Sequence, residues 1–236
     1  MNMKKLIYAA IALSAFAFSS CSDDDKLPDV KPADRGTVTD NLGNVYEWVR
    51  IGDQMWTTSN AKNGPALADA QYYNNFSWKY VLDDSQVDEY EKEYMPVYGN
   101  LMTYEEAVVS APEGWRLPSD EDWKKLERTL GMSDADSKGM RGEGVAYAMQ
   151  ATDSACELGL KLGGSVVPVK SYGWIDMDWE WVGEYGYYWT STVEPAYDAE
   201  QTFVYYRRLT ANIGTVSREC MRSDCYLSVR WVKDVE

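Results

Sequence analysis

Short runs in which hydrophobic and polar residues alternate predict strands near both ends of the chain, because a period of two puts every second side chain on one face. The first two runs, residues 45–51 and 54–58, flank Gly52-Asp53, and Gly-Asp between strand formers is typical of a hairpin turn. Four further runs lie late in the chain, at residues 187–192, 201–209, 215–218 and 226–232.

Two helices are predicted in the middle of the chain. Thr103 and Glu106 have the spacing of a capping box, in which each side chain accepts a hydrogen bond from the other residue's backbone N–H, and this helix ends before Pro112. Ser119 caps the second helix, which ends at Gly131. Its buried stripe comprises Trp123, Leu126 and Leu130. The order of strand pair, two helices and later strands indicates an α+β fold.

The N-terminus has the pattern of an export signal. Lys4 and Lys5 precede an apolar run at residues 6–18, which is shorter than the about 20 apolar residues of a membrane span, and Ser19-Ser20 stands directly before Cys21. We therefore expect residues 1–20 to be a lipoprotein signal peptide and Cys21 to carry the lipid that attaches the protein to a membrane. An ordinary secretory peptide followed by a chance cysteine is the alternative.

Residues 21–36 are rich in charge and poor in apolar side chains, so they predict a disordered acidic tether before a single domain at residues 37–236. The run Asp23-Asp24-Asp25 beside the cysteine resembles the surface-export signal of Bacteroidetes lipoproteins. This resemblance implies an outer-membrane protein exposed at the cell surface, whereas a merely solvated charge run is the alternative.

Charge and histidine content narrow the function further. The chain has 38 Asp and Glu against 23 Lys and Arg, a formal charge of −15 that disfavours a nucleic-acid partner. It contains no histidine, which excludes serine–histidine and cysteine–histidine nucleophiles, histidine bases and histidine metal ligands. We expect a protein that is not an enzyme and has no cofactor, although carboxylate, tyrosine or lysine chemistry stays open.

The aromatic residues favour a binding surface. There are 18 Tyr and 10 Trp against 4 Phe, and Tyr and Trp combine rigid contact area with a hydrogen-bonding group. Residues 61–97 lack sustained periodicity and predict a long irregular loop region, a kind of segment that is often functional.

Residues 171–186 alternate aromatic and acidic groups between glycines. The ligand-binding residues that we expect are Trp174, Asp176, Asp178, Trp179 and Trp181. On a period of two, Trp179 and Trp181 share one face, and packing in the core is the alternative for these rings. Asp176, Asp178 and Glu180 could also bind calcium, but the segment lacks the glycine and terminal glutamate of an EF-hand loop, so a solvated acidic strand face competes with a metal site.

Several motifs together resemble the Fibrobacter succinogenes major paralogous domain. They are Asp40-x-x-Gly43-Asn44-x-Tyr46, Ile51-Gly52-x-Gln54-x-Trp56, Tyr98-Gly99-x-Leu101, Pro112-x-Gly114-Trp115-Arg116-Leu117-Pro118-Ser119, Tyr188-Trp189-Thr190-Ser191-Thr192 and Ser228-Val229-Arg230-Trp231-Val232-Lys233-Asp234. Each is weak alone, but they follow in the right order over nearly the whole mature chain. The resemblance implies a C-type-lectin-like domain with two helices, a twisted antiparallel sheet and long loops. It makes Trp115, Trp123 and Trp189 core residues.

This sequence departs from the family pattern at two places. Family members usually carry a cysteine before the Pro-x-Gly-Trp turn and another after Ser-Val-Arg, where this chain has Ala111 and Trp231. The resemblance thus implies that a disulfide is missing and that Trp231 fills its space by packing. The calcium motifs of sugar-binding C-type lectins are also absent, since the chain has Glu194-Pro195-Ala196 instead.

Three cysteines remain in the mature domain, and an oxidising compartment permits disulfides. Cys220 and Cys225 flank four residues between two predicted strands, so they could face one another across a hairpin at bridging distance. We predict this disulfide, with free thiols or a bond to Cys156 as the alternatives.

The function expected from these observations is that of a non-catalytic, lipid-anchored binding module for an extracellular glycan or a surface protein. An enzyme is the alternative, because formylglycine-generating enzymes share the broad fold and paired carboxylates could act as acid and base. A structural or assembly component of the cell surface is a third interpretation.

Overall fold

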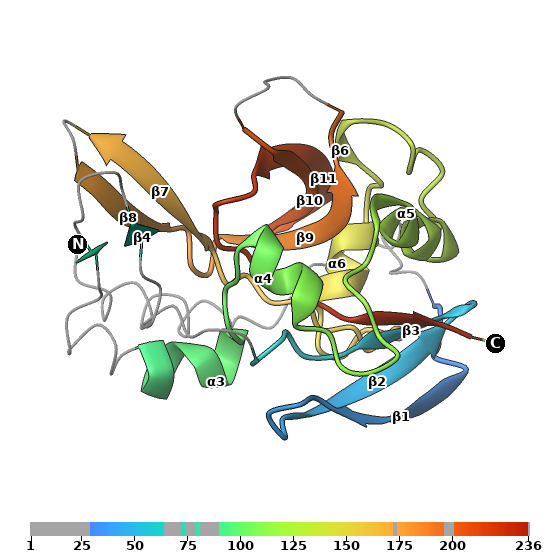
Figure 1. Ribbon diagram of the computed structural model, residues 1–236. Coiled ribbons are helices and arrows are strands. Elements are labelled where there is room, and N and C mark those ends of the chain that lie inside the picture. Colours follow the sequence, from blue (N-terminus) through green and yellow to red (C-terminus); the bar gives the residue numbers. More distant parts are fainter. Residues whose placement is uncertain are drawn as a thin grey trace.

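Two antiparallel four-stranded sheets and four short helices are the main elements in the described part of the chain (Figure 1). The computed structural model describes residues 29–63, 72–73, 79–80, 90–171, 174–195 and 201–235, with the backbone alone at 72–73, 79–80, 90–91, 169–171 and 174–180. The predicted α+β class is confirmed, whereas the expectation of two helices and one sheet is wrong.

The first sheet has the order β1-β2-β3-β12 and joins the beginning of the domain to its end. Its strands are β1 (Asp34–Thr39), β2 (Val45–Ile51), β3 (Gln54–Thr57) and β12 (Val232–Asp234). The hairpin predicted at Gly52-Asp53 forms, with Gly52 at a φ of 59° that glycine adopts readily. Residues 34–36 pair with β2, so they belong to the sheet rather than to the predicted tether.

The second sheet has the order β6-β11-β10-β9 and is covered on both faces. Its strands are β6 (Gly139–Arg141), β11 (Ile213–Arg222), β10 (Phe203–Thr210) and β9 (Tyr185–Val193). Neighbouring residues of β9 face opposite sides, because Tyr188 packs in one hydrophobic core while Tyr187 and Trp189 pack in the other. The run predicted at residues 226–232 forms a strand only at its end and otherwise makes isolated bridges.

Two small hairpins complete the strands. They are β4 (Tyr72–Tyr73) with β5 (Lys79–Tyr80), and β7 (Ser165–Ser171) with β8 (Trp174–Glu180). The first falls within the segment predicted to be an irregular loop.

The predicted capping box at Thr103 and the predicted cap at Ser119 are both present, and Asp122 forms a second capping box that was not predicted. Thr103 caps α4 (Tyr104–Val109) together with Glu106, and Ser119 caps α5 (Asp120–Thr129) together with Asp122. The other two helices are α3 (Met95–Tyr98), which follows a π-helical turn (Tyr90–Tyr94), and α6 (Val145–Gln150). Among the helices that the structure describes, none has the length and apolar character that crossing a membrane requires.

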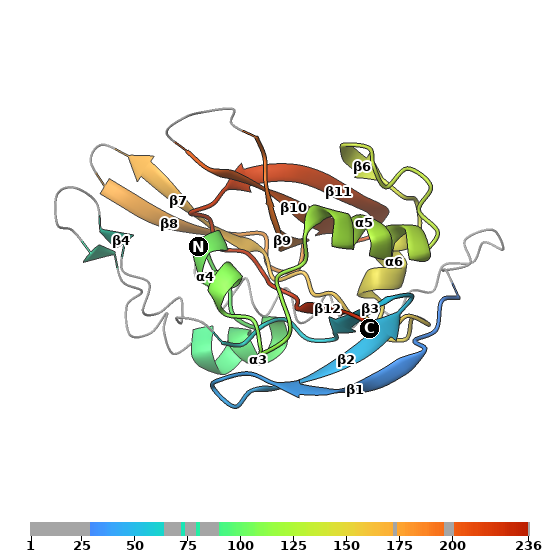
Figure 2. The ribbon, with the colours of Figure 1, turned by 45° about the vertical axis from the view of Figure 1, so that its right-hand side comes forward.

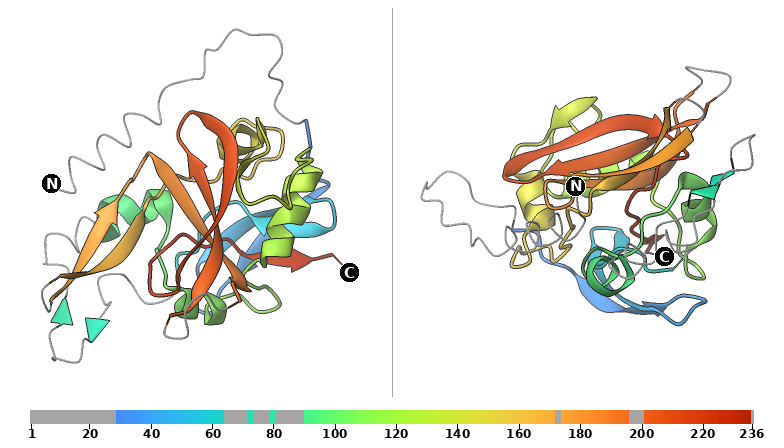
Figure 3. Two further views of the ribbon diagram at one scale, coloured as in Figure 1. Left: turned by 90° about the horizontal axis from the view of Figure 1, so that it is seen from above. Right: turned by 90° about the vertical axis from the view of Figure 1, so that its left-hand side faces the viewer.

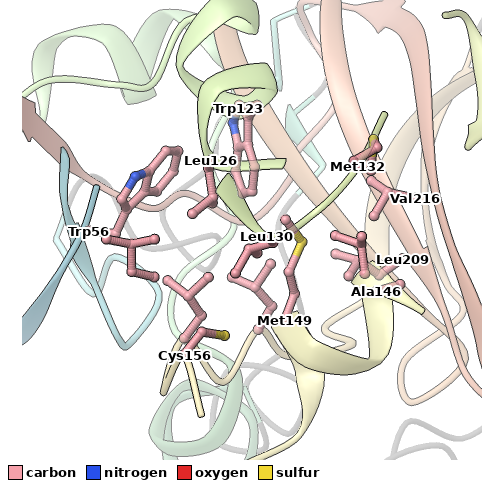
Figure 4. Packing of buried hydrophobic residues seen from close by; sticks show 14 of the residues in the cluster. Trp56, Trp123, Leu126, Leu130, Met132, Ala146, Met149, Cys156, Leu209 and Val216 are labelled. Carbon is pink, nitrogen blue, oxygen red and sulfur yellow. The ribbon is translucent and has the colours of Figure 1, made fainter. Parts of the chain in front are cut away.

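The first hydrophobic core lies where α5 and α6 meet the two sheets (Figure 2). Trp123, Leu126 and Leu130 of the predicted stripe are buried there, as expected. Figure 4 shows Trp56 of β3 beside Trp123 of α5, with ring centroids 4.8 Å apart in a tilted arrangement that suits two aromatic rings. The helix stripe therefore connects the first sheet with the second.

The second core lies on the opposite face of β9 and β10. Trp189 and Trp231 are fully buried in it, and Ala111 packs against its edge. The burial of Trp231 is thereby confirmed, whereas its replacement of a family disulfide stays a prediction. Trp189 also donates a hydrogen bond from Nε1 to the carbonyl of Met102 at 2.8 Å.

A buried charge network fixes α5 to the second sheet. The Glu127 carboxylate accepts hydrogen bonds from Arg141 of β6 at 2.5 Å and from Arg207 of β10 at 2.6 Å, and all three side chains are fully buried. About two turns nearer the start of α5, on the same face of the helix, Asp120 accepts from Arg207 at 2.7 Å and from Arg218 of β11 at 2.7 Å. Burial opposes ionisation of Asp120, but the hydrogen bonds and charges of the two arginines outweigh it and hold the pKa of this carboxyl far below its usual range.

Candidate functional site

The β7–β8 hairpin contains four of the five predicted ligand-binding residues and projects from the body of the fold (Figures 1 and 3). Its base is attached to the strand-like segment before β12: Val166 and Tyr226 exchange backbone hydrogen bonds of 3.1 and 2.8 Å. Arg222 adds a bond from its guanidinium to the carbonyl of Pro168 at 2.7 Å. The hairpin is therefore held at its base and extends outward beyond it.

The strand register places the predicted ligand-binding residues of β8 on two different faces of the hairpin. Alternate positions of a strand lie on opposite faces, so Trp174, Asp176 and Asp178 occupy one face and Trp179 the other. The short strand β5 lies against β8. Residues 79–80, which belong to the predicted loop region, thus lie next to the strand that carries Trp174 and Trp179.

Trp181, the fifth predicted residue, forms the turn between β8 and β9. Its backbone has a φ of 68°, in the left-handed region that a bulky side chain rarely adopts, and 43% of the residue is exposed. The turn is closed by hydrogen bonds from the N–H groups of Glu184 and Tyr185 to the Trp181 carbonyl, each 3.0 Å. A further bond from Gly183 N–H to Leu162 carbonyl, 2.7 Å, ties the turn to the preceding loop. The fold therefore holds an exposed aromatic ring on a strained backbone.

Four rings in contact lead from this turn into the second core, and we call them the aromatic row. Trp181 meets Tyr185 edge to face at 5.3 Å between centroids, Tyr185 meets Tyr187 at 5.9 Å, and Tyr187 meets Tyr206 of β10 at 5.7 Å. Tyr187 and Tyr206 are 7% and 4% exposed, so the row is anchored at that end and reaches solvent at Trp181. Such a series combines a rigid base with an accessible ring.

An ion pair lies beside the aromatic row. The Arg208 guanidinium lies over the Tyr185 ring, 5.5 Å from its centroid, and donates from Nη2 to Glu219 at 3.2 Å. Tyr206 donates its hydroxyl to the other oxygen of Glu219 at 2.7 Å. Burial raises the pKa of Tyr206, and the hydrogen bond to Glu219 raises it further, so the phenol stays protonated and the carboxylate remains its acceptor.

Residues 49–233 of the chain match the family model described as the Fibrobacter succinogenes major domain. The chain belongs to this family. No curated protein and no solved structure matches it. The resemblance drawn from the sequence motifs is thereby confirmed at the level of the family.

The Fibrobacter succinogenes major domain motifs contribute mainly to the scaffold. Trp56 and Trp189 are buried, and Arg230, in the closing motif, is fully buried and donates to the carbonyls of Thr57 at 2.6 Å and Leu158 at 3.0 Å. Burial lowers the pKa of Arg230 to about 10. Trp115, expected in the core, is only half-buried and packs beside Trp48. The aromatic row and its ion pair lie outside the quoted motifs, which separates the scaffold from the candidate surface.

The disulfide predicted between Cys220 and Cys225 is not present in the structure, where both residues and Cys156 are free thiols. Cys220 lies on the sheet face that carries Arg218, while Cys225 is buried in the second core on the other face, so the two side chains point apart. Burial is the main cause that raises the pKa of Cys220 to about 11 and that of Cys225 to about 12.

Two predicted sites lie partly or wholly outside the described residues. Cys21 precedes them, so its lipidation stays a prediction. Asp176, Asp178 and Glu180 are described by their backbone alone, and calcium binding there also stays a prediction. In the part of the chain that the structure describes, no group of three or more acidic or cysteine side chains is placed to hold a metal ion.

Sequence reasoning did not find Tyr185, Arg208 and Glu219. Arg208 and Glu219 are separated along the chain by a turn, and they meet only because Tyr206 pairs with Glu219 in the register of β10 and β11. The available signal was the alternation within each strand, which places Tyr206 and Arg208 on one face. It does not predict which residue of the next strand lies opposite.

Proposed function

We propose that the domain is a non-catalytic binding module outside the cell and that its ligand, a glycan, contacts the surface around Trp181. The observation that carries the proposal is the backbone of this residue, because a bulky side chain at a φ of 68° costs stability and is nevertheless held 43% exposed. Strain of this kind persists where the surrounding structure maintains it, and it concentrates at ligand-binding positions.

The chemistry of the surface suits a sugar. Pyranose rings present flat C–H faces edged by hydroxyl groups, so a site for them needs an aromatic plane next to hydrogen-bonding side chains. Trp181 supplies the plane, and Tyr185, in contact with it, extends the aromatic surface toward the sheet. Arg208 and Glu219 lie beside Tyr185 and supply hydrogen-bonding groups, and strand β8, which carries the predicted Asp176 and Asp178, adjoins the turn. Loops on a rigid scaffold are where binding groups concentrate.

The finer description of the fold belongs to the same proposal. The family resemblance implies a C-type-lectin-like arrangement, of which the four helices and two antiparallel four-stranded sheets would be an elaborated form. The absence of histidine from the sequence supports binding rather than catalysis. A lectin-type calcium site is not part of the proposal.

Substitution of Trp181 tests the proposal, because its effects on stability and on binding should differ. Trp181→Gly removes the ring but relieves left-handed strain of about 1–2 kcal/mol, so the free energy of unfolding should change by less than about 1 kcal/mol. Trp181→Ala keeps the strain and should be less stable than the glycine variant. Binding to immobilised glycans should weaken by about tenfold or more in both variants.

Glu157→Gly is a matched control, because Glu157 also has a positive φ, 58°, but contacts Arg35 of β1 and not the aromatic row. It should bind as the wild type does. The proposal is wrong if a broad panel of glycans gives no ligand for the wild type, or if Trp181→Gly lowers the melting temperature strongly and leaves affinity unchanged.

We also propose that Cys21 carries the lipid that places this domain at the outer membrane. The short apolar run that ends in Ser19-Ser20 supports this proposal. Cys21→Ala should release the protein into the soluble fraction, and mass spectrometry of the wild-type N-terminal peptide should find the mass of an added lipid. A mutant that stays wholly membrane-bound, with no lipid on the wild-type peptide, would contradict the anchor.

A further inference from the structure

The ion pair of Arg208 and Glu219 lies against the aromatic row and has no part in the buried network that fixes α5. Both side chains are partly exposed, 28% for Arg208 and 34% for Glu219. An isolated exposed ion pair contributes little to stability, so stabilisation of the fold does not explain why several side chains hold this pair in place. That support comes from three directions: the Tyr185 ring, the Ser217 hydroxyl and the Tyr206 hydroxyl.

Each member of the pair is held in one orientation. Tyr206 fixes one oxygen of Glu219, and its own ring is buried among the aromatic row. Arg208 donates from Nη2 to Glu219 at 3.2 Å and to Ser217 at 3.4 Å. Its Nε is buried without a hydrogen-bond partner, and among the described residues no partner accepts from Nη1. The pair thus presents an arginine donor and a carboxylate acceptor side by side in a fixed geometry.

We infer that Arg208 and Glu219 bind a vicinal diol of a neutral sugar residue whose ring stacks on the aromatic row. The guanidinium donates to one hydroxyl oxygen, and the neighbouring hydroxyl donates to the Glu219 carboxylate. Two adjacent hydroxyls match a donor and an acceptor that are themselves adjacent. This inference rests on the proposed function and specifies the class of sugar that the surface takes.

The distances allow one short oligosaccharide to reach both features. The Trp181 centroid and the Arg208 guanidinium lie 5.3 and 5.5 Å from the Tyr185 ring, which connects them. Charge favours a neutral ligand over an acidic one, because the ion pair has no net charge. The exposed Glu184 beside Trp181 and the formal chain charge of −15 repel anions.

Periodate provides a direct probe, since it cleaves the carbon–carbon bond of vicinal diols and leaves isolated hydroxyls intact. We would measure binding of the wild type to neutral (1→4)-linked glucan, xylan and mannan oligosaccharides, each before and after periodate oxidation and borohydride reduction. The glycan that binds should lose about tenfold or more in affinity on oxidation, because cleavage of the diol removes its hydrogen bonds and also opens the ring that stacks on the aromatic row. A uronic-acid oligosaccharide should bind less tightly than its carboxyl-reduced form.

Variants assign the effect to the pair. Arg208→Lys keeps the charge but not the planar fork, and Glu219→Gln removes the charge but not the shape. Each should weaken binding of the native glycan by about tenfold and leave the weaker binding of the oxidised glycan unchanged. Arg128→Gln is the control, because Arg128 is an exposed arginine of α5 that pairs with Glu121 and Asp136, away from the aromatic row, and this variant should bind as the wild type does.

The outcomes separate this inference from the function on which it rests. If Trp181→Gly abolishes binding while folded Arg208 and Glu219 variants bind native and oxidised glycans as the wild type does, the binding module stands and the diol assignment is wrong. Tighter binding of the uronic-acid oligosaccharide than of its carboxyl-reduced form also overturns the assignment. If no glycan of the panel binds the wild type, both proposals fail together.

Discussion

Glu127 is the residue whose neutralisation should destabilise the fold most clearly through electrostatics. Its carboxylate is fully buried and accepts from two fully buried arginines, Arg141 and Arg207, at 2.5 and 2.6 Å. Glu127→Gln keeps the shape of the side chain but removes the charge and directs an amide N–H₂ group at guanidinium donors. Asp120, at the other end of the network, then remains as the buried carboxylate that balances the arginines.

The expected loss is about 3–5 kcal/mol in the free energy of unfolding, because breaking a buried ion pair leaves an uncompensated charge in a medium that solvates it poorly. This is a large share of the about 5–15 kcal/mol by which folded domains are stable. Urea unfolding followed by tryptophan fluorescence measures the loss as a lower midpoint at constant slope.

Glu121→Gln provides a matched control on the same helix. Glu121 also pairs with an arginine, Arg128 at 2.8 Å, but its side chain is 65% exposed, so the variant should lose less than about 1 kcal/mol. A second comparison tests the mechanism. Replacing Glu127 and Arg141 together with Met removes a charge of each sign and should recover part of the loss. A Glu127→Gln variant as stable as Glu121→Gln would refute the reasoning.

Two further predictions concern titratable groups. Arg207 and Arg218 lower the pKa of Asp120 in the folded protein below its value in the unfolded chain. The ionised Asp120 carboxylate therefore contributes its full stabilisation above the unfolded-chain pKa of about 3.9. This stabilisation is lost as the pH falls through the lower pKa of the folded protein. Urea midpoints from pH 6 down to about 2 should therefore fall more steeply in the wild type than in Asp120→Asn. Burial raises the pKa of Cys220 to about 11 and that of Cys225 to about 12, so both thiols should react slowly with iodoacetamide in the folded protein at pH 8. Both should react rapidly once the protein is unfolded without reductant. Cysteines that do not react in the unfolded, unreduced protein would instead indicate the disulfide.

Elements determined by local interactions were predictable from the sequence, and those determined by register were not. The cap at Thr103 depends on Glu106 three positions away, and Ser119 directly precedes its helix, so local patterns predicted both helices. The buried position of Trp123 followed equally from a single helical stripe. In contrast, Asp120 and Arg218 lie 98 residues apart, and no local pattern indicates that they meet.

The candidate surface shows the same division. The exposure of the Trp181 ring could be predicted from the sequence, because acidic residues and a glycine lie next to it. Its left-handed backbone could not, since that conformation depends on the bonds that close the turn. The predicted pairing of Cys220 with Cys225 failed for a related reason. Spacing suggested a hairpin, whereas Cys220 lies on the face of β11 that carries Arg218 and Cys225, in the turn after β11, is buried in the second core.

Adjacent residues of the second sheet connect the scaffold to the candidate surface. Arg207 and Arg218 face α5 and are fixed by Asp120, while their chain neighbours Arg208 and Glu219 face the aromatic row. Because successive residues of a strand point to opposite faces, ion pairs that fix β10 and β11 from one side also fix the backbone from which Arg208 and Glu219 extend. Hydrogen-bonding groups are most effective when the structure around them determines their position in advance. Buried charges stabilise a core less than apolar packing does. Here Asp120, Arg207 and Arg218 have a further role, because they help to hold Arg208 and Glu219 at a constant separation beside the aromatic row.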